Sequence, residues 1–232
     1  MKRPILYAFV LSGLFLLVLS CGKDTDINGT TFPLVVSAKS LESPGTIRMF
    51  TKDGEIKDAA SIARFVGNVR MHGQNIFEES FESDEDNKIT FLSKDSLVFA
   101  GMELRYGITE IQPGKFIITR DFQSMAHGPL YGMSVTEDIW RLGANHSPLE
   151  KNPAPVAGFF LTGKETRVGY GSFKSFKLPI LLFKLKRQVD IGGSVSIQEN
   201  AGNRFDEFDE EFIFTLKNQD TLAIQQHYVL FK

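Results

Sequence analysis

Cysteine is nearly missing from this chain: of its 232 residues, only Cys21 carries a thiol. A single cysteine excludes a disulfide within the chain, and it leaves no cysteine cluster for a structural zinc site or an iron–sulfur centre. The four histidines, at positions 72, 127, 146 and 227, show no close metal-ligand spacing. The sequence therefore predicts no metal and no cofactor other than a group that modifies Cys21.

Catalytic sequence motifs are missing as well. The chain has no Gly-x-Ser-x-Gly nucleophile elbow, no His-Glu-x-x-His helix and no dinucleotide-binding glycine fingerprint. Its formal net charge of −2 offers no basic field for nucleic acid. A glycosidase would need two facing carboxylates from distant strands, which a sequence does not reveal. A non-enzymatic role is therefore favoured, and a polysaccharide hydrolase stays open as an alternative.

One near-match to a nucleotide-binding motif occurs between Gly158 and Glu165. The spacing of Gly158, Gly163 and Lys164 is that of the phosphate loop, but this motif needs a hydroxyl side chain after the lysine to ligate magnesium. Glu165 stands there instead and would repel phosphates. We interpret the segment as a buried strand followed by a Gly-Lys turn.

Long apolar runs are confined to the N-terminus. Lys2 and Arg3 precede an uncharged stretch from Ile5 to Leu19, an arrangement typical of a secretion signal. The stretch is shorter than the ~20 apolar residues that a comfortable transmembrane anchor needs. It ends in Val18-Leu19-Ser20-Cys21, which resembles the lipobox of bacterial lipoproteins: an aliphatic residue, a variable one and a small one before the cysteine. The resemblance covers this N-terminal segment only.

The resemblance implies a lipid anchor at Cys21. In that family a diacylglyceryl group is attached to the cysteine sulfur, the leader is cut off before it, and the new amino group is usually acylated. Each buried methylene contributes ~0.8 kcal/mol, so several acyl chains hold such a protein firmly in a bilayer. Gly22 follows the cysteine where inner-membrane lipoproteins have Asp, which implies an outer-membrane address. Whether the protein faces the periplasm or the cell surface stays open.

The mature chain has the composition of a β-rich domain. It contains 21 phenylalanines but one tryptophan, and many of the phenylalanines alternate with Val, Ile and Thr. We predict a signal peptide at 1–20, a lipidated flexible tether at 21–33, and a single antiparallel all-β domain of roughly ten strands at 34–232, either a lipocalin-like barrel or a sandwich. Strands are expected at Leu34–Ala38, Thr46–Thr51, Lys88–Leu92, Ser96–Ala100, Glu103–Ile111, Lys115–Asp121, Val156–Thr162, Lys177–Lys186, Ser194–Gln198, Glu211–Lys217 and Leu222–Phe231.

Turn residues and one helix complete the predicted domain. Short turns at 52–54, 112–114 and 218–220 are typical of antiparallel hairpins. A short helix is expected from Asp58 to Val66, with Asp58 as its N-cap. The segment from Phe173 to Arg187 interleaves aromatic and basic residues, and we interpret it as a strand with a solvated basic face that includes Lys184, protected at a sheet edge.

The strand pattern lapses between Phe122 and Ala154. An excursion of this length is typical of a lid or binding loop. It contains four residues that combine apolar contact with hydrogen bonding, so we take them as candidate binding residues: His127, Tyr131, Trp140 and His146. The leading hypothesis is a non-enzymatic cell-envelope protein that binds a small molecule, a glycan or an envelope protein. A structural accessory subunit of an outer-membrane assembly is the alternative.

Overall fold

The computed structural model describes residues 29–42, 45–67, 70–71, 74–77, 87–99, 104–123, 133–153, 159–191 and 194–232. The proposed leader, Cys21 and most of the predicted tether lie outside these ranges. No helix in the described ranges has the length and apolar character needed to span a bilayer. The helices are α2 (Ala59–Val66), α3 (Met133–Arg141) and the 3-10 helix η1 (Glu210–Thr215).

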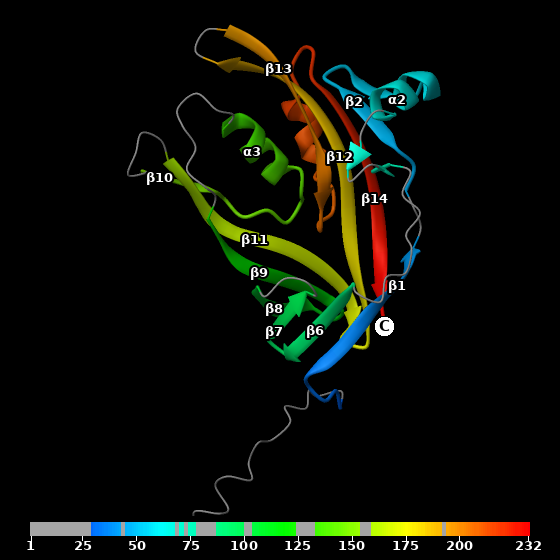
Figure 1. Ribbon diagram of the computed structural model, residues 1–232, viewed down its shortest axis with the longest axis vertical. Helices are drawn as coiled ribbons and strands as arrows, with labels where there is room; N and C mark the ends of the chain where they lie inside the picture. The colour runs from blue at the N-terminus through cyan, green and yellow to red at the C-terminus, as the bar shows by residue number, and fades with distance from the viewer. Residues whose placement is uncertain are drawn as a thin grey trace, which may run out of the picture.

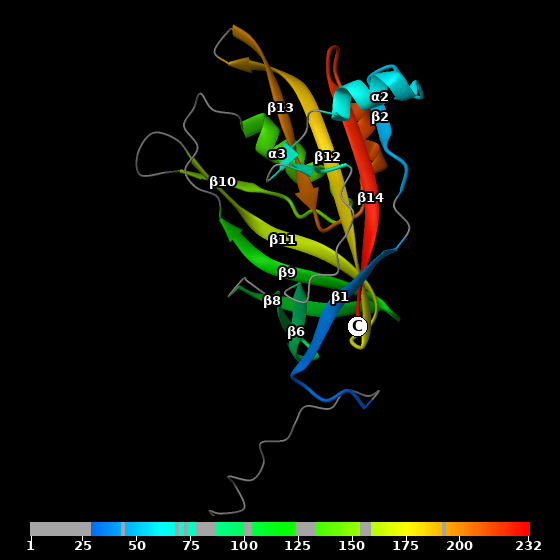
Figure 2. The same ribbon diagram turned by 45° about the vertical axis from the view of Figure 1, so that its right-hand side comes forward.

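The fold is an antiparallel β-barrel with additional strands (Figures 1 and 2). Eight strands form a closed circuit in the order β12, β11, β9, β8, β7, β6, β1 and β14, and β14 pairs with β12 again. This confirms the predicted all-β class and selects the barrel over the sandwich. The strands are β1 (Leu34–Glu42), β2 (Arg48–Thr51), β3 (Gly54–Ile56), β4 (Arg70–Met71), β5 (Gln74–Asn75), β6 (Lys88–Ser93), β7 (Ser96–Phe99), β8 (Arg105–Gln112), β9 (Lys115–Gln123), β10 (Glu150–Pro153), β11 (Phe159–Ser172), β12 (Ser175–Ile191), β13 (Ser194–Arg204) and β14 (Thr221–Phe231).

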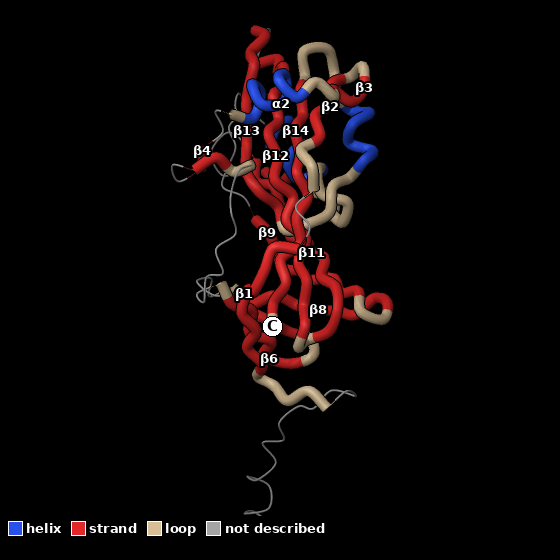
Figure 3. Tube along the Cα trace, turned by 90° about the vertical axis from the view of Figure 1, so that its right-hand side faces the viewer, coloured by secondary structure: helices blue, strands red, loops and turns tan. Residues whose placement is uncertain are grey.

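The barrel opens at one end because β12 outruns its neighbour β11. β11 pairs with β12 only over 175–177, whereas β14 pairs with β12 from Phe176 to Lys186. Beyond Leu181, β13 occupies the edge of β12 that β11 has left. An upper sheet of β13, β12, β14, β2 and β3 therefore extends past the barrel (Figure 3).

The two faces of this upper sheet bury different helices, since side chains alternate along a strand. Leu181, Phe183 and Leu185 pack with η1 and the end of α3, whereas Leu182 packs with α2. α2 begins where the sequence predicts, because the Asp58 carboxylate accepts a hydrogen bond from the Ser61 amide at 2.8 Å.

The lower part of the barrel is filled by aromatic side chains. The rings of Phe91, Phe116, Phe173 and Phe176 lie with their centroids 5.0–5.5 Å apart. Phe32, in the predicted tether, is only 4% exposed, and its ring lies 5.2 Å from that of Phe173. The last residues before β1 therefore belong to the barrel core.

The strand predicted at Glu211–Lys217 is wrong, because this segment forms η1. In an extended strand Phe212, Phe214 and Leu216 would share one face, but Phe212 and Leu216 are buried while Phe214 is 88% exposed. The turn predicted at 218–220 is present, because the Asp220 amide donates to the Lys217 carbonyl and Gln219 has a positive φ, but it connects η1 to β14 and not two strands of a hairpin. The turns at 52–54 and 112–114 are confirmed: Gly54 and Gly114 have positive φ, and their strands pair antiparallel.

The structure also corrects two predictions from the sequence, the turn at Gly163 and Lys164 and the position of Lys184 at a sheet edge. β11 runs without a break through Gly163 and Lys164, so no turn follows a strand there. Lys184 lies on a central strand, not at an edge, because β12 pairs with both β13 and β14. Its side chain is buried rather than solvated: Nζ donates to the Phe65 carbonyl at 2.8 Å and forms an ion pair with Glu199 at 3.2 Å.

Gly169 leaves room for the ring of Phe176, and this contact yields a test of the barrel core. A Cβ at Gly169 would lie 2.2 Å from Cζ of Phe176, so we expect Gly169→Ala to lower the free energy of unfolding by about 1–3 kcal/mol. Gly107→Ala is the control, because its Cβ would meet only Thr119 at ordinary contact distance. Urea denaturation measures both variants. Equal stability of the two would contradict the packing described here.

Candidate binding site

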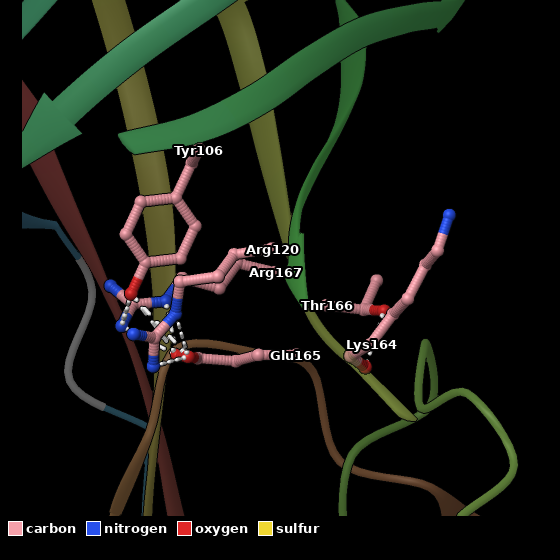
Figure 4. Close-up of polar contacts among 6 residues, drawn as sticks. All are labelled: Tyr106, Arg120, Lys164, Glu165, Thr166 and Arg167. Carbon is pink, nitrogen blue, oxygen red and sulfur yellow. Dashed lines mark hydrogen bonds and ion pairs between the residues drawn. The ribbon is translucent and has the colours of Figure 1, made fainter. Parts of the chain in front are cut away.

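A charged cluster lies inside the barrel, near the end where β11 and β12 part. Glu165 pairs with Arg120 of β9 across the ladder, and Arg167 pairs with Ile118, so all four side chains share the face that Ile118 presents to the core. Figure 4 shows Glu165, Arg167, Arg120 and Tyr106 converging, whereas Lys164 points the other way. The alternation of β11 thus sends Glu165 and Arg167 inward.

One carboxylate binds two guanidinium groups in this cluster. Glu165 Oε2 accepts from Nε of Arg120 at 2.8 Å and also pairs with Nη2 of Arg120. Glu165 Oε1 accepts from Arg167, at 3.1 Å from Nε and 2.7 Å from Nη2. Nη2 of Arg167 donates to the Tyr106 hydroxyl at 3.0 Å, and this hydroxyl lies 3.4 Å from Glu165 Oε2.

The charges of the cluster do not balance. Burial pushes the pKa of Glu165 upward, but Arg167 and Arg120 outweigh burial and hold this pKa below its ordinary value, so the carboxylate is ionised at neutral pH. Burial raises the pKa of Tyr106, which keeps its hydroxyl protonated and neutral. Two arginines therefore share one negative charge.

A pocket of ≈ 260 Å³ adjoins Arg167 within the barrel. The guanidinium carbon of Arg167 lies 4.5 Å from the ring centroids of both Phe99 and Phe205, in cation–π contact. The pocket lies between β1, β12, β14, β11 and the ends of β6 and β7, and its lining is mostly apolar: Ala38, Asn87, Lys88, Phe99, Arg167, Leu178, Ile180, Phe205, Val229 and Phe231. This arrangement can hold a small, largely apolar molecule.

Two of the four residues predicted to bind lie in the described chain, and both stabilise the excursion itself. Trp140, on α3, is only 8% exposed; its Nε1 donates to the Ser147 carbonyl at 2.7 Å, and its ring lies 4.8 Å from that of Phe122. Nδ1 of His146 lies 2.8 Å from the Gly143 carbonyl oxygen. Neither residue lines the barrel pocket. His127 and Tyr131 lie outside the described residues.

The second half of the excursion is docked onto the barrel rather than free. Leu142 is fully buried in the cluster with η1 and β12. Asp206 accepts from the Asn145 backbone amide at 3.2 Å and from its side-chain amide at 2.8 Å. A Cβ at Gly143 would lie 2.3 Å from an oxygen of Asp206, so only glycine fits there. A hollow of ≈ 590 Å³ remains between β9, β11 and residues 147–150.

A second buried ion cluster joins the upper elements. Arg187 on β12 forms an ion pair with Asp138 on α3, lies 3.3 Å from Asp220, and donates to the Thr215 carbonyl at 2.9 Å. Asp220 also accepts from the backbone amides of Gln188 and Lys217. Two carboxylates surround one guanidinium here, so this cluster has no excess positive charge and is best explained as a structural joint.

Sequence reasoning missed Tyr106, Arg120, Glu165 and Arg167. One signal was available: Glu165 and Arg167 are two positions apart, so in an extended strand both charges lie on the same face. Within the described residues, no group of three or more His, Cys, Asp or Glu side chains could hold a metal ion. Comparison with known protein families, curated proteins and solved structures finds no match for this chain. Its function is therefore argued from the site.

Glu165→Gln tests the shared carboxylate. Removing one partner of a fully buried ion pair costs ~3–5 kcal/mol, and because the Glu165 side chain is 20% exposed we expect a loss of about 2–3 kcal/mol at neutral pH. The folded pKa lies below the ordinary 4.5, so this stabilisation is complete above that value and is lost as the pH falls through the folded pKa.

The measurement is urea denaturation of wild type and Glu165→Gln from pH 7 down to about pH 3. The difference in unfolding free energy between the two should narrow below the ordinary pKa. Glu150→Gln, at an exposed position of β10, serves as the control. A difference that stays constant across this range would contradict an ionised Glu165 in the cluster.

Proposed function

We propose that this protein is a lipid-anchored protein of the bacterial outer membrane that binds a small, largely apolar molecule in its barrel. The pocket beside Arg167 carries the proposal, because the described barrel core next to it is packed with aromatic and aliphatic side chains. A cavity of about 150 Å³ accommodates benzene, so ≈ 260 Å³ accommodates roughly ten non-hydrogen atoms. This size suits a small metabolite rather than a long lipid.

The anchor in this proposal is the lipid on Cys21, as the lipobox resemblance implies. The described chain begins at Gly29, and the segment before β1 lies at the lower end of the barrel, far from α2 and β13 (Figures 1 and 2). From Cys21 to Gly29 the chain reaches at most about 28 Å. The lower end would therefore lie next to the bilayer, and the end near β13 would point away from it.

A structural accessory subunit is the second candidate, and the edge of the upper sheet favours it. β13 ends the order of the sheet, and its Val195 and Ile197 are 66% and 51% exposed. An edge strand with exposed apolar residues can pair with a strand of another protein. For the hydrolase alternative we find no support in the pocket, because no carboxylate lines it among the described residues.

Cys21→Ala tests the anchor. Without the thiol no thioether to a glycerolipid can form, so we expect the variant to leave the detergent phase in Triton X-114 partitioning and the wild type to enter it. Mass spectrometry of the wild type should find the acylated cysteine as the N-terminal residue. A free thiol, or a leader still attached, would contradict the lipoprotein assignment.

Ala38→Leu tests the pocket as the binding site. The added side chain would fill part of the cavity, so we expect the affinity for naphthalene, a neutral probe of suitable size, to fall by roughly tenfold or more. Val35→Leu is the matched control, because Val35 lies on the same strand and is 54% exposed. Fluorescence titration gives both affinities. Unchanged binding by a folded Ala38→Leu variant would exclude this pocket as the site.

A further inference from the structure

We propose that the ligand of the barrel pocket carries one anionic group, a carboxylate at the end of an alkyl chain, with about eight carbon atoms in all, and that Arg167 binds this group. The inference rests on the proposed function and specifies the chemistry of its ligand. Three observations carry it: the excess positive charge beside the pocket, the position of the Arg167 guanidinium, and the apolar character of the remaining lining.

The first observation is the charge of the cluster. Arg120 and Arg167 share the single carboxylate of Glu165, and the neighbouring hydroxyl of Tyr106 is neutral. Arg204 also interacts with Glu165 and Arg167, and its charge is offset by that of Asp206. Among the described residues of this cluster, one positive charge is therefore left over. A buried charge without a counter-ion is costly, and a bound anion would remove this cost.

The second observation is the position of the guanidinium. Arg167 lines the pocket and is only 6% exposed. Its Nε and Nη2 are bound to Glu165 and Tyr106, whereas Nη1 donates to no acceptor in the described part of the chain. The rings of Phe99 and Phe205 pack against the group in cation–π contact. A carboxylate placed here would form a charge-assisted hydrogen bond in a medium of low polarity, where such a bond is strong.

The third observation is the remainder of the lining. Leu178, Ile180, Val229 and Phe231 offer an alkyl chain an apolar wall. Lys88 is a second cation at the pocket, and among the described residues no aspartate or glutamate lines it. An inorganic anion would leave this wall without contacts, and a neutral hydrocarbon would leave Arg167 without a counter-ion. An amphipathic carboxylate satisfies both parts.

The test compares three ligands that share a straight chain of eight carbon atoms and differ in their polar end: octanoate, 1-octanol and octylamine. Isothermal titration calorimetry uses the lipid-anchored protein in phosphatidylcholine vesicles, with protein-free vesicles subtracted. We expect octanoate to bind roughly tenfold or more tightly than octanol, and octylamine to bind more weakly than octanol. In Arg167→Met the affinity for octanoate should fall to that for octanol, while the affinity for octanol stays the same. Lys164→Met, on the same strand but pointing the other way, should behave as wild type (Figure 4).

The outcomes separate this inference from the function on which it rests. If octanol binds wild type as tightly as octanoate, the anionic ligand is excluded while binding in the pocket stands. If none of the three ligands binds, both proposals fail. Should Arg167→Met not fold, the ¹⁵N resonance of the Arg167 Nε in wild type decides: octanoate should shift it and octanol should not. An unshifted resonance at saturating octanoate would overturn the role of Arg167.

Discussion

The length of β12 is the constraint on which the remaining structure depends. Its first residues close the barrel between β11 and β14, and its continuation forms the middle of the upper sheet. A strand has only two hydrogen-bonding edges, so β12 cannot keep β11 where β13 pairs with it. The pairing of β11 with β12 ends at Lys177 of β12, and the barrel opens there. The side chains of Glu165 and Arg167 on β11 therefore point into a part of the interior that is no longer closed by backbone pairing. The position of the candidate site follows from this exchange of neighbours.

The structure contains two buried ion clusters, and they differ in charge. Around Arg187, two carboxylates and a backbone carbonyl surround one guanidinium, which joins α3 and η1 to the upper sheet. Around Glu165, two guanidinium groups share one carboxylate. Buried charges persist where other groups compensate them. In the first cluster that compensation is internal, whereas the second has an excess that a ligand would neutralise. This contrast favours a binding role for the barrel cluster and a structural role for the other.

The site was out of reach of the sequence, although much of the fold was not. The helix capped by Asp58 and the turns at Gly54 and Gly114 follow from neighbouring residues, and the structure has each of them. Trp140 drew attention because of its residue type, yet its N–H donates to the Ser147 carbonyl and its ring packs against Phe122 and Arg204. Arg120 meets Glu165 across 45 positions of the chain, and no local pattern indicates such a partner.

What the sequence determined by itself is local: alternation that makes strands, turns that reverse them, a cap that begins a helix, and an N-terminal segment whose pattern resembles a lipobox. These depend on residues a few positions apart, whose backbone preferences act in any context. The tertiary structure decided which strands became neighbours. It also decided that residues 210–215 form a 3-10 helix that buries Phe212, and that the inward-facing Arg167 lies beside a cavity. Burial and charge balance in these places depend on segments distant in the chain, because only the closed barrel brings them together.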